Sequence, residues 1–309
     1  MTAAHWHVLF VYFGFMLIAT LLALVKSWVK PKSNGESVWH KYPTYILINL
    51  FFLAASWSPT RFHILNGLLA ILGGLASWEI TRTLQSDGQA DDPNQKPQLE
   101  FLFALLPFVT FFLIAVAGWL DVAAWLRVWL IAFLVFMLWI TLIGQPADYA
   151  RRALALGASI IYLPLCLVIY QWIQKLDGSG FLAVFLYLSV ATNDAMAQIT
   201  GELFGASPLI PRLSPSKTVE GAVGGFLFAG AMGVTLSNSV GWGDVTGIVT
   251  GLAVGLSALF GDLTASAWKR ALGLKNFSAL LGAQGGVLDR FDGLIFAAPV
   301  FYLLLAIAF

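Results

Sequence analysis

Ten continuous apolar runs, each of helix length, constrain the fold of this chain more than any other feature. The 309 residues are 59% hydrophobic and 11% charged, which is more apolar surface than a soluble domain of this size can bury. Backbone amides find no partners in lipid, so spanning segments are helices or closed barrels, and uninterrupted runs favour helices. We therefore predict an all-α polytopic membrane protein with about ten transmembrane helices. The expected spans cover residues 7–25, 44–59, 63–80, 101–119, 122–143, 153–173, 181–200, 219–240, 244–265 and 293–309.

Lysine and arginine indicate the orientation of these spans. With the N-terminus outside, the loops after spans 1, 3, 5, 7 and 9 face the cytoplasm and hold fourteen of the seventeen basic residues. Only Arg61, Arg127 and Lys175 fall elsewhere. Because cytoplasmic loops carry an excess of Lys and Arg, both termini are predicted to lie outside.

The two halves of the chain differ in the charge they carry within the membrane. Residues 1–150 hold few ionisable side chains in their spans and are interpreted as a scaffold, whereas residues 151–309 hold many and should carry the chemistry. The apolar N-terminal run lacks a basic leader, so we expect a retained span and not a signal peptide. The single Cys166 excludes an internal disulfide, and a net charge of +1 gives no indication of nucleic-acid binding.

A polar stripe lies in the second half of the span at residues 181–200 and continues just past its end. Asp194, Gln198 and Glu202 are spaced i, i+4 and i+8, which places them along one face of a helix. Such a stripe serves either helix packing or a ligand or metal site.

The loop after this span leads into a glycine-rich helix start. Arg212 is followed there by four residues suited to an anion, Ser214, Ser216, Lys217 and Thr218. Free amides at a helix N-terminus, with a lysine and hydroxyls beside them, favour phosphate. The loop lacks the glycine that a P-loop has before its lysine, so a basic loop with an ordinary capped helix is the alternative.

Residues 261–270 combine a carboxylate with cations. Asp262, Ser266 and Lys269 share a helix face at i, i+4 and i+7, and Arg270 flanks them. This combination suits a metal ion and the phosphates that the ion binds, although a Lys-Arg pair alone would be a membrane anchor.

Residues 275–293 bring a second acidic pair. If the last helix begins here, Asp289 and Asp292 lie on one face at i, i+3, with Arg290 between them. Two neighbouring carboxylates repel unless a cation compensates them, so this pair predicts a divalent metal site.

Residues 266–292 resemble the signature of the phosphatidate cytidylyltransferase family, also called CDP-diacylglycerol synthases. The matching residues are Ser266, Lys269, Arg270, Lys275, Gly285, Gly286, Asp289, Arg290 and Asp292. Upstream, the likeness extends to Asp194, Ser214, Pro215, Lys217, Thr218, Glu220, Gly221, Gly261 and Asp262. The first half of the chain matches only in hydrophobicity.

Two positions depart from the signature. Asn276 and Gln284 stand where the family has Asp and His. Asn loses a charge and Gln loses a titratable group, although both keep hydrogen-bonding ability. The departures leave open whether activity is retained, redirected to another substrate or lost.

The resemblance implies an enzyme that transfers cytidylyl from CTP to phosphatidic acid, giving CDP-diacylglycerol and pyrophosphate. It implies Mg²⁺, bound by Asp262, Asp289 and Asp292, and a second, monovalent cation such as K⁺. Charge neutralisation and in-line positioning should supply the catalysis. The expected catalytic residues are Asp262, Lys269, Arg270, Asp289, Arg290 and Asp292; the phosphate-binding residues are Ser214, Ser216, Lys217, Thr218, Ser266 and Lys275; the supporting residues are Asp194, Gln198, Glu220 and Gln284.

The predicted topology places all of these residues on the cytoplasmic side of a bacterial inner membrane, where CTP is found and a lipid head group can enter. Family analogy also admits a homodimer. Two other functions remain open. A catalytically silent homologue would bind CTP or anionic lipid without turnover, and a cation-coupled transporter would use intramembrane carboxylates for its ion.

Overall fold

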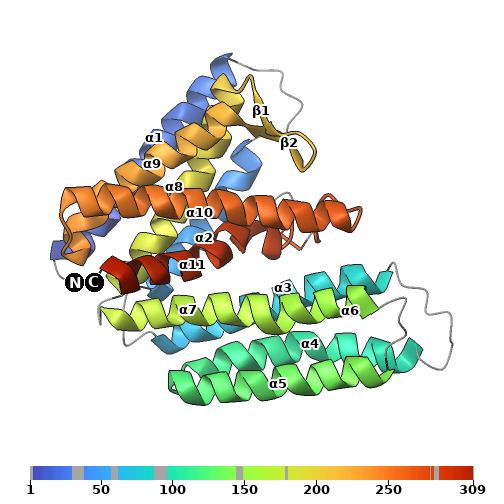
Figure 1. The fold of residues 1–309 in the computed structure, drawn as a ribbon. Helices are drawn as coiled ribbons and strands as arrows, with labels where there is room; N and C mark the ends of the chain where they lie inside the picture. Colours follow the sequence, from blue (N-terminus) through green and yellow to red (C-terminus); the bar gives the residue numbers. More distant parts are fainter. Residues whose placement is uncertain are drawn as a thin grey trace. The chain divides into compact units, whose positions relative to one another are not determined.

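The computed structural model describes residues 3–29, 38–56, 62–86, 96–143, 149–177, 180–278, 280–281 and 285–308. Within these residues the regular secondary structure is helical apart from one small hairpin, which confirms the predicted all-α class (Figure 1). The first six helices are α1 (Ala3–Val29), α2 (Val38–Ser56), α3 (Phe62–Ser86), α4 (Lys96–Ala117), α5 (Val122–Ile143) and α6 (Tyr149–Leu156). After the π-helix η3 (Gly157–Tyr162) come α7 (Leu163–Leu176), α8 (Phe181–Phe204), β1 (Pro208–Ile210), β2 (Ser214–Thr218), α9 (Val219–Ser237), the 3₁₀ turn η4 (Asn238–Val240), α10 (Asp244–Ala271) and α11 (Leu288–Ala308).

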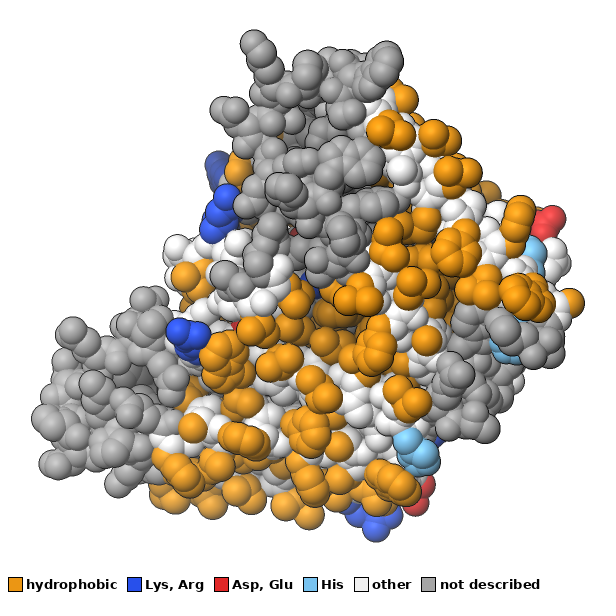
Figure 2. Space-filling model, turned by 180° about the vertical axis from the view of Figure 1, so that it is seen from behind, with side chains coloured by type: hydrophobic (Ala, Val, Ile, Leu, Met, Phe, Trp, Pro, Cys, Tyr) orange, Lys and Arg blue, Asp and Glu red, His pale blue; other side chains and the backbone are white. Residues whose placement is uncertain are grey.

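Helices occupy most of each of the ten predicted spans. Eight helical segments among the described residues are long and apolar enough to cross a membrane, and two shorter apolar helices, Ile46–Ala55 and Phe103–Ala117, account for the others. Figure 2 shows that hydrophobic side chains dominate the described part of one face and that charged side chains there are few. Such a surface is suited to lipid, so the chain is an integral membrane protein.

The chain forms two compact units, each built from separate stretches of sequence. Unit 1 comprises Met1–Pro59, Ile173–Trp268 and Asp292–Phe309, and unit 2 comprises Thr60–Trp172 and Lys269–Phe291. The division falls within α7, within α10 and within α11. Each unit is described by itself below.

In unit 1, α8 is the central helix and is buried along most of its first half. The helices around α8 approach one another closely because glycine occupies the positions where they cross. Gly233 of α9 faces the backbone of Gly247 and Gly251 of α10, where an added Cβ would collide with backbone atoms. Close backbone approach at small residues is typical of helix packing in membranes.

Contacts at one end of unit 1 bring both ends of the described chain together. His7 Nδ1 of α1 lies 3.1 Å from Ser239 Oγ of η4. Beside η4, Trp242 makes ring contacts with Phe185 of α8 and Phe301 of α11. These contacts place the described ends of α1 and α11 at one end of unit 1, and the predicted location of both termini outside the membrane stays a prediction.

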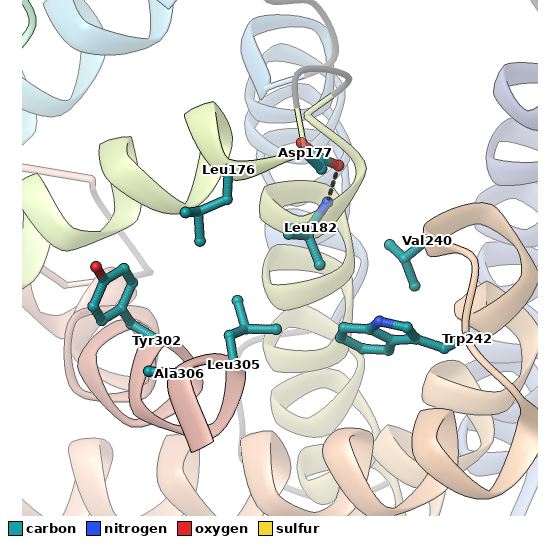
Figure 3. Close-up of a pocket in the computed structure, with 8 residues that line it drawn as sticks. All are labelled: Leu176, Asp177, Leu182, Val240, Trp242, Tyr302, Leu305 and Ala306. Carbon is teal, nitrogen blue, oxygen red and sulfur yellow. Dashed lines mark hydrogen bonds between the residues drawn. The ribbon is translucent and has the colours of Figure 1, made fainter. Parts of the chain in front are cut away.

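A pocket of about 320 Å³ opens at this end of unit 1 (Figure 3). Its lining is largely apolar: Leu176, Asp177, Leu182, Val240, Trp242, Tyr302, Leu305 and Ala306. The Asp177 carboxylate accepts hydrogen bonds from Gly180 N (2.8 Å) and Leu182 N (3.0 Å), so it caps the start of α8. An apolar lining with one engaged carboxylate offers no catalytic chemistry, and the predicted site residues lie elsewhere.

In unit 2, the π-helix η3 interrupts the span formed by α6 and α7. Pro164 has no N–H, so the carbonyl four residues earlier, at Ile160, lacks its usual helical donor. Trp129 Nε1 of α5 donates to Ile160 O at 2.7 Å, and Thr110 Oγ1 of α4 donates to Ser159 O at 2.7 Å. Side chains from two neighbouring helices thus satisfy carbonyls that the irregular turn exposes.

Replacing Trp129 tests this arrangement. Trp129→Phe removes the donor and leaves the buried Ile160 carbonyl unsatisfied, so we expect a loss of about 1–3 kcal/mol in the free energy of unfolding. Trp139→Phe on the same helix is the control, because Trp139 makes ring contacts with Phe101 and Phe136. Thermal unfolding in detergent should show the larger shift for Trp129→Phe, and equal shifts would contradict the role of the hydrogen bond.

Candidate active site

The predicted polar stripe lies on the second half of α8, in unit 1. Gln198 Nε2 donates to Glu202 Oε1 at 3.2 Å, and Asn193 Nδ2 donates to Asp194 Oδ1 at 3.3 Å. Asn193 is buried, and its side chain lies against Gly225 of α9. The stripe therefore combines an inward-facing packing residue with carboxylates that are partly accessible.

The loop after α8 forms a two-stranded antiparallel hairpin that the sequence did not predict. Pro208 pairs with Thr218 and Ile210 pairs with Ser214. Thr218 is the N-cap of α9, with an extended backbone, and its Oγ1 accepts a hydrogen bond from Gly221 N at 3.1 Å. The cap agrees with the alternative of an ordinary capped helix, and phosphate binding by this loop stays a prediction.

Glu220, predicted as a supporting residue, fixes the base of this hairpin. Its carboxylate accepts hydrogen bonds from Ala206 N (3.1 Å) and Ser207 N (3.2 Å). A carboxylate in the first turn of a helix also interacts favourably with the helix dipole. Glu220 thus joins the end of α8 to the start of α9 and sets the position of the strand that carries Lys217.

Lys217 and Asp262 form an ion pair between β2 and α10. Lys217 Nζ contacts Asp262 Oδ2, and the two side chains are 23% and 35% exposed. The hairpin end of unit 1 therefore unites two of the predicted site residues, which are 45 positions apart in the sequence. This end lies opposite the termini, because α8 runs from Phe181 beside them to Phe204 beside the hairpin, about 36 Å at 1.5 Å per residue.

Gly261, next to Asp262, permits a close crossing of α10 and α11. A Cβ on Gly261 would lie 2.5 Å from Asp292 O and 3.0 Å from Gly293 Cα. Asp292 is 5% exposed, and its Oδ1 accepts a hydrogen bond from Gly293 N at 2.7 Å. Two predicted metal ligands, Asp262 and Asp292, therefore flank one helix crossing within unit 1.

Asp289 is the centre of the cluster in unit 2. Its Oδ1 accepts from Lys269 Nζ at 2.7 Å, while its Oδ2 accepts from Phe277 N at 3.0 Å and Gly286 N at 2.9 Å. The carboxylate is 7% exposed, and Lys269 also lies over the Phe277 ring. Asp289 thus connects the end of α10 to two points of the loop between α10 and α11. The spacing of Asp289 and Asp292 predicted a metal ligand at this position, but it did not predict these hydrogen bonds of Asp289.

Glu79 is a residue of this cluster that the sequence interpretation missed. It lies on α3, is 1% exposed, and accepts hydrogen bonds from Ser278 Oγ (2.6 Å), Val287 N (2.8 Å) and Leu288 N (2.9 Å). A signal was present, since Glu79 is the only ionisable side chain in the predicted span 63–80 apart from His63. Buried intramembrane carboxylates are functional candidates.

The other predicted residues occupy the same elements. Ser266 is buried on α10, and Arg270 Nη1 donates to Leu274 O at 3.0 Å. Arg290 lies in the first turn of α11 and is partly buried. Ser214 and Ser216 lie on β2, and Lys275 and Asn276 are exposed in the loop after α10. Gln284 falls outside the described residues.

The acidic residues suit a hard divalent cation in their chemistry. Asp262, Asp289 and Asp292 offer only oxygen donors, which Mg²⁺ prefers, and the Gly261 crossing brings two of their helices together. Among the described residues no three His, Cys, Asp or Glu side chains converge on one point, and lysines contact Asp262 and Asp289. The predicted Mg²⁺ site therefore stays a prediction, with a suitable donor set.

Comparison with known proteins agrees with the motifs that form this site. The model of a family described as the cytidylyltransferase family matches residues 39–308. A phosphatidate cytidylyltransferase of Aquifex aeolicus is 37% identical over 146 residues, 47% of this chain and 55% of that protein. One of Brucella abortus is 41% identical over 128 residues, 40% and 46% of the two chains.

A protein of Escherichia coli named uncharacterized protein YnbB is also similar. It is 31% identical over 185 residues, which cover 56% of this chain and 60% of that protein. The chain thus spans about half to three fifths of the length of these curated relatives.

Proposed function

This chain belongs to the cytidylyltransferase family, and we propose that it transfers the cytidylyl group of CTP to phosphatidic acid or a related lipid phosphate. The products are CDP-diacylglycerol, or its counterpart, and pyrophosphate. The observation that supports this most directly is the pairing of a lysine with an aspartate in each unit, Lys217 with Asp262 and Lys269 with Asp289. Cations held beside carboxylates on the signature residues suit a reaction between a nucleoside triphosphate and a lipid phosphate.

In the proposed reaction, an oxygen of the lipid phosphate forms a bond to the α-phosphorus of CTP. The bond from that phosphorus to the oxygen bridging the β-phosphate breaks, and pyrophosphate leaves with the electron pair. The attacking oxygen is already anionic, so no general base is required. The difficulty lies in bringing two anions together, which is a problem of charge neutralisation and alignment.

The basic residues would hold the phosphates. Lys217 extends from β2, and its ammonium group exchanges Asp262 for a phosphate oxygen when substrate is present. Lys269, Arg270 and Arg290 supply further cations at the adjoining ends of α10 and α11. Free amides and the hydroxyls of Ser214, Ser216 and Thr218 would add donors at the start of α9.

Asp262, Asp289 and Asp292 would hold Mg²⁺, which supplies a Lewis acid that neutralises phosphate oxygens. Asp194 and Gln198 lie on the second half of α8, which ends at Phe204 before the hairpin, and would support this site. We place the site on the cytoplasmic face of a bacterial inner membrane, where CTP is available and lipid head groups lie at the ends of the helices.

Transfer from labelled CTP tests the proposal. Purified protein in detergent, given Mg²⁺ and phosphatidic acid, should form lipid-linked CMP and pyrophosphate in equal amounts. Diacylglycerol, which lacks the attacking phosphate, is the matched control and should give none. If no lipid phosphate accepts CMP, the enzymatic function is wrong, and CTP binding without turnover would then favour the silent homologue.

A further inference from the structure

Glu79 has no place in the transfer mechanism, although it is among the most deeply buried charged side chains described. It belongs to α3, and its hydrogen-bond partners lie 199 to 209 positions later in the sequence. All of these contacts are within unit 2. The first half of the chain, interpreted above as a scaffold, therefore reaches the signature segment through one carboxylate.

Each oxygen of Glu79 has a defined partner at the start of α11. Oε1 accepts from Ser278 Oγ and Val287 N, and Oε2 accepts from Leu288 N. The two amides belong to the N-terminus of α11, where free N–H groups and the helix dipole favour a negative charge. Glu79 therefore acts as an N-terminal cap that a different helix supplies.

Gly286 makes this approach possible. A Cβ at position 286 would lie 2.6 Å and 2.7 Å from the two oxygens of Glu79, closer than any side chain could tolerate. The preceding Gly285 has φ +82, a conformation that favours glycine. The paired glycines of the signature thus serve the contact with Glu79, in addition to shaping the turn.

Glu79 and Asp289 bind adjacent residues of the same loop. Asp289 binds the amides of Phe277 and Gly286, and Glu79 binds the neighbouring Ser278 and Val287. The loop is therefore held at two places, at Phe277–Ser278 and at Gly286–Val287, and at each place by one residue of α11 and one of α3. The first turn of α11, which this arrangement fixes, carries Asp289 and Arg290.

We propose that Glu79 is a positioning residue of the cytidylyl-transfer site. It fixes the loop between α10 and α11 and the first turn of α11, so that Asp289 and Arg290 are correctly placed to bind substrate. This inference rests on the proposed function. It predicts that loss of the carboxylate misplaces charged groups by a small distance, and an error of about 1 Å lowers turnover by about a hundredfold.

Glu79→Gln is the central variant, because it keeps the shape of the side chain and removes the charge. One Gln oxygen can still accept, but its NH₂ group faces backbone N–H donors. Ser278→Ala is the milder companion, since it removes one donor and leaves both amide contacts. Asn66→Ala is the matched control: Asn66 lies on the same helix, is buried, and bonds Ala115 O and Gln171 Nε2 away from the loop.

Two readouts separate positioning from general stability. The first is kcat per folded protein, measured at a temperature where all variants remain folded. It should fall by about tenfold or more in Glu79→Gln and by less in Ser278→Ala. In Asn66→Ala it should stay within about twofold of wild type. Hydrogen exchange at the amides of Val287 and Leu288 should accelerate by about tenfold or more in Glu79→Gln and not in Asn66→Ala.

Equal losses of kcat in Glu79→Gln and Asn66→Ala would overturn the proposal, as would unchanged exchange at the two amides. If Glu79→Gln does not fold, Ser278→Ala decides by the same two measurements. The exchange experiment needs no turnover. A wild-type protein without transferase activity would therefore contradict the proposed function, while unprotected amides in that protein would contradict the cap itself.

Discussion

Asp262→Asn should lower kcat/KM for cytidylyl transfer by about a thousandfold, the scale expected when one electrostatic contact to a developing charge is lost from a site of this kind. Asp262 lies beside the crossing of α10 and α11, next to Gly261, and contacts Lys217. The substitution is isosteric, so helix packing is preserved. The expected loss comes from the missing negative charge, which weakens Mg²⁺ binding and leaves Lys217 without its counterion.

Asp244→Asn is the control for this prediction. Asp244 lies at the opposite end of the same helix, where its Oδ1 accepts from Ser237 Oγ at 3.3 Å. The same change of charge there should alter transfer by no more than about twofold, because exposed charges far from a site are screened. Retention of more than a tenth of the activity by Asp262→Asn would contradict the assignment of this residue.

A magnesium titration separates the two roles of Asp262. The half-saturating Mg²⁺ concentration should rise in Asp262→Asn and stay unchanged in Lys217→Met, whereas the KM for CTP should rise in Lys217→Met. If both variants shift only the KM for CTP, Asp262 acts by holding Lys217 and does not bind metal. Asp289→Asn is less informative for this purpose, because Asp289 also holds Lys269 and two loop amides.

Local features of the fold followed directly from the sequence. A continuous apolar run that contacts lipid forms a helix, because the helix satisfies its own backbone hydrogen bonds. Each predicted span therefore corresponds to a helix. A helix begins directly after Thr218, as the glycine-rich segment that follows it indicated, and Thr218 caps that helix. The last helix begins at Leu288, five residues before the predicted span, and Asp289 and Asp292 fall in its first turns as their spacing required. These are all effects of neighbours in the chain.

Features that depend on distant residues were not predictable. No spacing rule links Glu79 to Ser278, because the connection exists only once α3 packs in unit 2. The π-helix η3 depends on donors from Trp129 and Thr110, on two other helices. The same holds for Lys217, whose residue type indicated phosphate binding but whose partner Asp262 comes from α10. The residue types indicate the chemistry of the site, whereas the partner of each residue depends on tertiary packing.

The second large effect is expected from Gly261→Ala, which adds one methyl group at the crossing of α10 and α11. Its Cβ would meet Asp292 O at 2.5 Å, Phe296 Cβ at 2.8 Å and Gly293 Cα at 3.0 Å. Two of these neighbours are backbone atoms that cannot rotate away, so the helices must separate. We expect a loss of about 1–3 kcal/mol in the free energy of unfolding.

Activity should fall further than stability alone explains. Separating α10 from α11 moves Asp262 away from Asp292, so the folded fraction of Gly261→Ala should show a raised Mg²⁺ requirement and a kcat lowered by about a hundredfold. Gly14→Ala on α1 is the control, because its Cβ would meet nothing within 4 Å, and it should keep its activity and gain up to about 1 kcal/mol. Wild-type turnover in folded Gly261→Ala would show that the two aspartates need not act together, because the crossing is the feature that brings their helices into contact.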